Sequence, residues 1–196
     1  MRQPTPRPAT LTRALAGDPS LARQVAMVLA GSLLVAASAQ VSVPMYPVPM
    51  TLQTLAISLI GLTYGARLAA ITLAVYLVQG ALGLPVFAGG AATLPYMMGP
   101  TGGFLIGFVA MAWATGWLVE RGLDRGIVRL FVASFLPALG LFVPGVLWLW
   151  AVTPLSIEGA FAAGALPFLP GAVVKAAIAA LIVAGGWKAL AARNRG

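Results

Sequence analysis

The sequence predicts an all-α integral membrane protein of about six transmembrane helices, with a Gly/Pro-rich loop over an outward-facing ligand pocket. Of its 196 residues, 60% are hydrophobic and 8% are charged, whereas a soluble domain carries roughly 25% charged residues. The apolar runs approach the ~20 residues that a helix needs to cross the hydrocarbon core, and the charges lie between these runs. We therefore expect a cytoplasmic N-terminal arm at 1–20, a six-helix membrane domain at 21–191 and a cytoplasmic tail at 192–196.

Three helices are expected in the first part of the chain. The first covers 21–43 and ends at the proline cluster 44–49, because proline lacks an amide donor and blocks helix continuation. The second and third cover 50–64 and 68–82 and are joined by a tight turn at 65–67. Both are short for a span exposed to lipid, so we expect them to be tilted or covered by neighbouring helices.

The segment 80–107 is rich in glycine, contains three prolines and carries no charge. Irregular backbone at membrane depth is tolerated only where protein buries it or where it lines a cavity. We therefore expect a re-entrant loop or a lid over a binding site. The fourth helix follows at 102–119 with Thr101 as its N-cap, and a charged turn covers 120–129.

The last two helices are expected in the C-terminal third. The fifth covers 127–152, with a kink near Pro137 or Pro144 because proline interrupts helical hydrogen bonding. A loop is expected at 153–170, followed by the sixth helix at 171–191.

The positions of Lys and Arg predict the orientation in the membrane. With six spans both termini share a side, and eleven of the twelve Lys and Arg residues then fall on that side. The opposite loops, at 44–49, 83–100 and 153–170, contain no Lys or Arg, and Glu158 is their only charge. A wrong helix count would scatter the cations over both faces. We expect a multi-pass protein of the cell (inner) membrane, in contact with lipid, with both termini in the cytoplasm.

Lys175 is the exception among the cations. It lies about one turn into the sixth helix, near ~6 Å of depth at 1.5 Å per residue. Holding an ammonium group within the bilayer costs ~2.5–3.5 kcal/mol, so such a lysine normally faces a partner or a wet cavity. One alternative is that it extends to the outer headgroups. No acid of the chain is predicted at this depth, which makes an anionic ligand the candidate partner.

Other candidate site residues lie near the predicted outer ends of the helices. Gln53 needs a hydrogen-bond partner, which is either a ligand or another helix. Tyr96, with Thr101 nearby, is either a ligand contact or an ordinary interfacial aromatic residue. Gly89 and Gly90 do not belong to a phosphate-binding loop, because no Lys followed by Ser or Thr comes after them. Close approach of their backbone to a ligand or a helix is expected instead.

A stripe of small residues runs along the first helix. Ala22, Ala26 and Ala30 recur at a spacing of four, which places them on one face of a helix and allows another helix to approach closely. Two uses of this stripe are open at this point. It packs inside the protein, or it docks a second membrane protein.

Composition excludes several classes of function. The chain has no Cys or His, which removes thiolate catalysis, the usual zinc ligands and the commonest general base. We therefore expect neither an enzyme nor a metal or other cofactor. The cations flank apolar runs, so nucleic-acid binding is not expected either. Neither an ATP-binding motif nor an intramembrane acid is present, so the alternative of a stand-alone secondary carrier for a small anionic solute lacks a coupling group.

Four blocks of the sequence stand out, at residues 46–55, 80–90, 99–104 and 170–175. They resemble the BioY family, the biotin-specific substrate-capture subunits of energy-coupling-factor (ECF) transporters, and the similarity extends over 21–191. The resemblance implies a six-helix membrane subunit that binds biotin at its outer face. It also implies association with a coupling transmembrane subunit and with ABC-type ATPase subunits.

The resemblance further implies that Lys175 belongs to the biotin site and that the alanine stripe is the docking surface for the coupling subunit. Many family members carry an aspartate where this chain has Ala172. Biotin offers a carboxylate for an ammonium group, a ureido group for hydrogen bonds and an apolar remainder, for which Trp148 is an alternative to Phe87. The predicted substrate-binding residues are Lys175, Gln53, Tyr96, Gly89, Gly90, Phe87 and Thr101.

Overall fold

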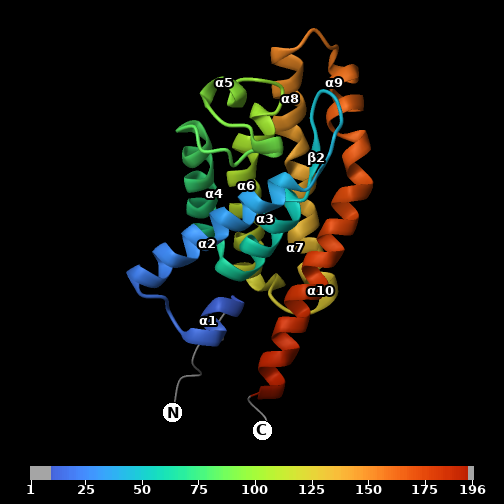
Figure 1. Cartoon of the computed structure of the whole chain (residues 1–196). Helices are drawn as coiled ribbons and strands as arrows, with labels where there is room; N and C mark the ends of the chain where they lie inside the picture. The colour runs from blue at the N-terminus through green and yellow to red at the C-terminus, as the bar shows by residue number, and fades with distance from the viewer. Residues whose placement is uncertain (1–9, 194–196) are drawn as a thin grey trace.

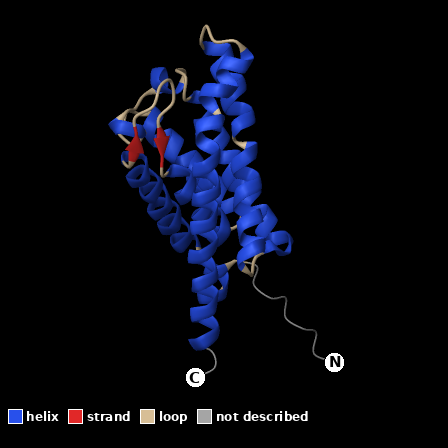
Figure 2. Cartoon of the chain, turned by 90° about the vertical axis from the view of Figure 1, so that its right-hand side faces the viewer, coloured by secondary structure: helices blue, strands red, loops and turns tan. Residues whose placement is uncertain are grey.

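The computed structural model describes residues 10–193. They form a bundle of α-helices with one small two-stranded sheet (Figures 1 and 2). The predictions for the ends of the arm and the tail, at 1–9 and 194–196, lie outside the described residues.

The longer helices build the bundle and the shorter elements sit at its ends. The longer helices are α2 (Leu21–Gln40), α3 (Gln53–Tyr64), α4 (Ala66–Ala81), α6 (Gly102–Leu118), α7 (Ile127–Gly140), α8 (Phe142–Val152) and α10 (Leu169–Arg193). The shorter elements are α1 (Leu11–Ala16), β1 (Ser42–Val43), β2 (Met50–Thr51), the 3₁₀ turn η1 (Ala88–Gly90), α5 (Leu94–Met97), the π turn η2 (Val119–Leu123), α9 (Ile157–Gly164) and the 3₁₀ turn η3 (Leu166–Phe168).

Four helical segments of the described chain are long and apolar enough to cross a membrane: Leu21–Gln40, Gly102–Leu123, Ile127–Val152 and Ile157–Arg193. The protein is therefore a multi-pass membrane protein. Helices α3 and α4 are shorter, and they pack against α6 and against each other. The expectation that neighbours cover these short helices is confirmed, because α3 buries seven of its twelve residues.

A small hairpin separates the first two predicted helices. Helix α2 ends at Gln40, α3 begins at Gln53, and β1 pairs with β2 in antiparallel register, with Ser42 opposite Thr51 (Figure 2). The sequence reading extended both helices by about three residues into these strands. The proline cluster 44–49 forms the connection, because proline supplies no amide donor to continue either helix.

The predicted loop at 153–170 was wrong, because α9, η3 and the start of α10 occupy it. The Ser156 hydroxyl accepts a hydrogen bond from the Gly159 amide at 3.1 Å and caps α9. Pro167 and Pro170 lie in the first turns of η3 and α10, where a missing amide donor costs little. These prolines begin helical turns here, whereas the sequence reading treated them as marks of a loop.

The fifth predicted helix is divided in two near its prolines. Helices α7 and α8 are separated by the single residue Leu141, which lies between Pro137 and Pro144. Pro144 has no amide hydrogen to donate to the Gly140 carbonyl. The helical hydrogen bonds on either side are kept, from Leu141 to Pro137 at 3.0 Å and from Gly145 to Leu141 at 3.2 Å.

The cation-bearing connections gather at one end of the bundle. Helix α1, the α3–α4 turn, the α6–α7 connection and the end of α10 all lie in the lower half of Figure 1. At this end Glu120 accepts a hydrogen bond from the Ala66 amide at 3.0 Å and so caps α4. Helix α1, a helical element inside the predicted polar arm, is held there by a 2.6 Å hydrogen bond from the Thr12 hydroxyl to the Thr63 carbonyl.

Glycine allows α6 to cross the α3–α4 turn at backbone contact. The turn is made by Gly65, whose φ of 85° favours glycine. A Cβ atom on Gly116 of α6 would overlap backbone atoms of Gly65 and Ala66. The absence of a side chain at Gly116 is therefore a requirement of this crossing.

Candidate functional site

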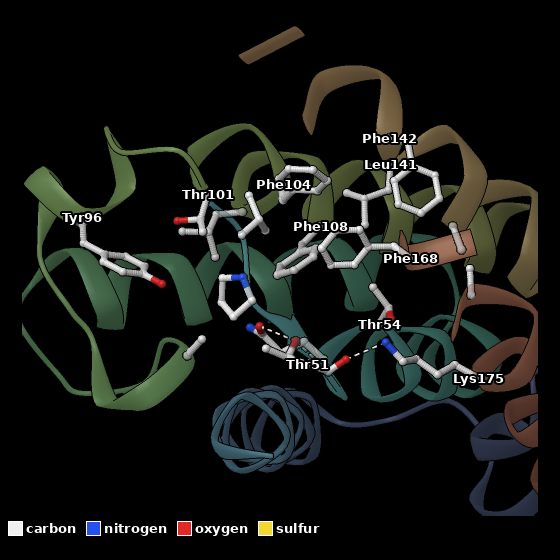
Figure 3. A pocket seen from close by; sticks show the side chains of 17 residues that line it. Thr51, Thr54, Tyr96, Thr101, Phe104, Phe108, Leu141, Phe142, Phe168 and Lys175 are labelled. Atoms are coloured by element: carbon white, nitrogen blue, oxygen red, sulfur yellow. Dashed lines mark hydrogen bonds between the residues drawn. The ribbon is translucent and has the colours of Figure 1, made fainter. Parts of the chain in front are cut away.

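A cavity lies between the hairpin and helices α3, α6, α7, α8 and α10 (Figure 3). The hairpin lies toward the end of the bundle opposite the chain termini (Figure 1). The cavity encloses about 690 Å³, including the space at its open mouth. Its lining residues are Val48, Pro49, Thr51, Gln53, Thr54, Ala88, Tyr96, Thr101, Phe104, Leu105, Phe108, Ala138, Leu141, Phe142, Phe168, Ala172 and Lys175.

Four phenylalanines form the apolar wall of the cavity. Phe104 and Phe108 come from α6, Phe142 from α8 and Phe168 from η3 (Figure 3). The ring centre of Phe168 lies 6.4 Å from those of Phe104 and Phe142. These distances are typical of packed aromatic pairs. The wall can therefore hold an apolar ring or alkyl chain.

Lys175 reaches into this cavity from α10, opposite the hairpin (Figure 3). Its ammonium group donates a 2.6 Å hydrogen bond to the backbone carbonyl of Thr51. The alternative of an ammonium group extended to the headgroups does not hold in the structure, because the side chain bonds inward. The carbonyl is neutral, and none of the described residues that line the cavity is acidic. The positive charge remains available to an anion.

Gln53 also lines the cavity and is almost fully buried, with 4% of its surface exposed. Its Oε1 accepts a hydrogen bond from the Thr51 hydroxyl at 2.8 Å, and its Nε2 donates to the Tyr76 hydroxyl at 2.7 Å. The interhelical alternative is therefore realised, since Tyr76 belongs to α4. An amide has two N–H groups and two oxygen lone pairs. One of each remains for a ligand in the cavity that Gln53 lines.

Tyr96 and Thr101 lie at the far end of the cavity from Lys175 (Figure 3). The Tyr96 hydroxyl points into the cavity, and within the described part of the chain it has no hydrogen-bond partner. Thr101 precedes α6 as predicted, but its side chain makes no capping hydrogen bond among the described residues. Its backbone is already helical there, with φ of −83° and ψ of −9°, whereas a capping residue has extended backbone.

The structure places Gly89 and Gly90 in η1 but outside the cavity lining, where their neighbour Ala88 contributes instead. A Cβ atom on either would meet no atom of residues 10–193 within 4 Å, so their backbone does not approach a described helix closely. The expected approach to a ligand stays a prediction. Their positive φ angles of 65° and 76° are the reason for glycine.

Phe87 and Trp148 do not line the cavity either. Phe87 is fully buried behind Tyr96, and the two rings stack at 5.5 Å. The Trp148 indole donates a 2.9 Å hydrogen bond to the Gly99 carbonyl and packs on Gly102 and Gly103. Both residues support the 84–103 segment from behind, so the prediction that one of them forms the apolar wall does not hold for this cavity.

The substrate-binding residues predicted from the sequence include neither the four wall phenylalanines nor Thr51. Phenylalanine within an apolar helix has no pattern that separates a cavity wall from a lipid-facing surface. The role of Thr51 depends on its backbone carbonyl as well as on its hydroxyl, and a carbonyl is common to every residue. Proximity to the predicted Gln53 was the one available signal for Thr51.

A second surface lies on α2. Ala22, Ala26 and Ala30 are all exposed, whereas the buried face of this helix contains Val28 and Val35. The alternative that the alanine stripe packs inside this chain was therefore wrong. The stripe lies on the outer surface of the bundle.

No metal centre is present among residues 10–193, which contain no group of three or more His, Cys, Asp or Glu side chains able to hold an ion.

Comparison with known proteins identifies the family. The model of the BioY family matches residues 7–192. The probable biotin transporter BioY of Pyrococcus horikoshii is 37% identical over 161 residues, which cover 82% of this chain and 94% of that protein. The biotin transporter BioY of Rhodobacter capsulatus is 39% identical over 170 residues, covering 79% and 87%.

A solved structure shows the same fold. The crystal structure of the S-component for biotin from an ECF-type ABC transporter aligns with a TM-score of 0.73 at 20% identity, covering 87% of this chain and 95% of that one. The match of the family model over nearly the whole sequence, together with relatives of 37% and 39% identity, shows that the chain belongs to the BioY family.

Proposed function

We propose that this protein captures biotin and carries it across the cytoplasmic membrane as the substrate-binding subunit of an ECF transporter. Relatives of similar length are named biotin transporters. The observation that carries the proposal is the composition of the cavity, in which one lysine, an amide and hydroxyl groups face a wall of four phenylalanines. The protein is a transporter component and not an enzyme.

The polar groups of the cavity match the two ends of biotin. Lys175 lies at one end and Tyr96 at the other (Figure 3). An ammonium group has three donors, so two remain for the biotin carboxylate when Thr51 accepts the third. The remaining amide groups of Gln53 and the Tyr96 hydroxyl then serve the ureido group. The thiophane ring and alkyl chain pack against the phenylalanine wall.

The alanine at position 172 affects how much of the carboxylate recognition falls to Lys175. It lines the cavity one helical turn before Lys175, and an aspartate at this position would place a carboxylate close to the ammonium group. Without that carboxylate the charge of Lys175 is not neutralised from within its own helix. We infer that Lys175 carries a larger share of carboxylate recognition here than in a family member with the acid.

Equilibrium binding of labelled biotin to the purified chain in lipid nanodiscs tests the proposed function. We expect saturable binding at one site, with displacement by unlabelled biotin and no need for ATP or an ion gradient. A chain that shows no saturable binding would contradict the proposal. Uptake driven by a proton or sodium gradient in liposomes that contain only this chain would instead support a stand-alone carrier.

We propose that the membrane domain covers 21–191 and crosses the bilayer six times, with α3 and α4 as the second and third spans and both termini in the cytoplasm. Cations at the terminus-bearing end support this orientation. Because the chain lacks cysteine, single-cysteine variants carry one thiol each. We expect a membrane-impermeant maleimide to label Glu158→Cys in intact cells and Ala192→Cys only after permeabilisation. The reverse pattern would invert the orientation.

The exposed alanine stripe on α2 is proposed as the docking surface for the coupling transmembrane subunit, which links this chain to ABC-type ATPases. Small residues allow close helix approach, and a large side chain would prevent it. We expect Ala26→Trp to abolish co-purification with the coupling subunit while biotin binding is retained. Ala151→Trp, on the exposed face of α8, is the matched control and should co-purify normally. Equal behaviour of the two variants would rule out this surface.

A further inference from the structure

Tyr76 lies directly behind the cavity but does not line it. It belongs to α4 and is fully buried. Its hydroxyl donates a 2.9 Å hydrogen bond to the Val86 carbonyl and accepts a 2.7 Å hydrogen bond from Gln53 Nε2. A tyrosine hydroxyl has a single hydrogen. Because that hydrogen is committed to Val86, the hydroxyl acts toward Gln53 as an acceptor.

This arrangement determines which way the Gln53 amide faces. Its nitrogen must lie toward Tyr76, and its oxygen therefore lies toward the Thr51 hydroxyl, which donates to it at 2.8 Å. Reversing the amide would set the amide oxygen against the Tyr76 oxygen and leave the Val86 carbonyl to compete for the single hydroxyl hydrogen. The remaining N–H and lone pair of Gln53 are thus presented in one fixed arrangement.

The ring of Tyr76 supports a second polar group of the site. It packs edge to face with Phe87, with 5.5 Å between the ring centres and 80° between the ring planes. Phe87 in turn stacks on Tyr96 at 5.5 Å and 16°. Gly80 makes room for this stack, since a Cβ atom there would overlap the Phe87 ring. The ring that carries the cavity-facing Tyr96 hydroxyl therefore rests, through Phe87, on Tyr76.

We infer that Tyr76 is a positioning residue that sets the hydrogen-bond selectivity of the cavity for a cyclic urea, by fixing the orientation of the Gln53 amide. The inference rests on the proposed binding of biotin and deepens it. Tyr76 touches no ligand and acts through Gln53. Tyr76 also connects α4 and the 84–91 segment to the hairpin. It bonds to Val86 and to Gln53, and Gln53 bonds to Thr51 of the hairpin, whose carbonyl accepts from Lys175.

The test is a double-mutant cycle in full-length protein, with labelled biotin as the probe. Tyr76→Phe keeps the ring and removes the hydroxyl, and it should lower biotin affinity about tenfold, which is the value of one well-made hydrogen bond. In a Gln53→Leu background the same substitution should change affinity less than twofold. Tyr64→Phe is the matched control. Tyr64 is the last residue of α3, at the end opposite Gln53, and it does not line the cavity. The Tyr64→Phe variant should bind biotin with unchanged affinity.

A second probe keeps the test decisive if Gln53→Leu binds too weakly to measure. Thiophane pentanoic acid, which lacks the ureido ring, should bind to Tyr76→Phe as well as to the unchanged protein. Equal losses for both probes, or equal losses in both Gln53 backgrounds, would mean that Tyr76 only stabilises the fold, and the inference would be overturned. If the unchanged protein does not bind biotin, the proposed function fails first.

Discussion

Lys175→Ala should lower the affinity for biotin by about 30-fold or more. Removing one partner of a partly buried, hydrogen-bonded charge pair costs ~2–5 kcal/mol, and each 1.4 kcal/mol is a factor of ten in affinity. Lys175 is also the one charged residue among the described residues that line the cavity. Competition binding with labelled biotin measures the loss.

Two further variants separate charge from shape. Lys175→Met keeps much of the chain length without the charge and should bind as weakly as the alanine variant. Lys175→Arg keeps the charge, but its planar guanidinium group differs in geometry from an ammonium group, so partial affinity is expected. Lys188→Met, which removes a cation near the other end of the same helix, should leave binding unchanged. Unchanged biotin affinity in the alanine and methionine variants would mean that Lys175 does not bind the carboxylate and serves only to hold the Thr51 carbonyl in place.

Gly116→Ala should destabilise the protein by roughly 3 kcal/mol, near the upper end of the usual cost of overpacking. The new methyl group would overlap the backbone of Gly65 and Ala66. Backbone atoms cannot turn aside as a flexible side chain can. The turn is further restrained by the hydrogen bond from the Ala66 amide to Glu120. Thermal unfolding of the detergent-solubilised protein measures the effect.

Gly185→Ala provides the matched comparison. Gly185 lies inside α10, and a Cβ atom there would meet no described atom within 4 Å. Alanine is favoured over glycine in a helix by ~1 kcal/mol, so this variant should unfold at the same temperature or higher. If both variants unfold at the same temperature, α6 does not cross the turn at backbone contact.

Much of the helical layout could be read from sequence because two strong constraints act on it. The bilayer sets the length of an apolar helix, which located the spans that begin at Leu21 and near Gly102 and Ile127. Proline and glycine then marked the breaks at 44–49, Gly65 and Leu141. The same rule misled at 153–170, because a proline in the first turn of a helix resembles one in a loop.

The candidate site was predictable only in part. Four polar residues stood out in the sequence, because a polar side chain at membrane depth needs a hydrogen-bond or charge partner. All four line one cavity: Lys175, Gln53, Tyr96 and Thr101. Gly89, Gly90 and Phe87 belonged to the same conspicuous segment, yet they lie behind or beside the cavity. Sequence proximity to a binding segment does not specify which side of that segment faces the ligand.

The sequence by itself determined that this protein lies in lipid, where most of its longer helices run and that one lysine is out of place, because these follow from side-chain chemistry measured against a bilayer of fixed thickness. The tertiary structure alone decided what that lysine faces. Its partner carbonyl lies 124 residues away, on Thr51, and the phenylalanine wall comes from three separate elements. Such contacts depend on how helices cross, and close crossings such as that at Gly116 depend on backbone geometry that no single stretch of sequence encodes.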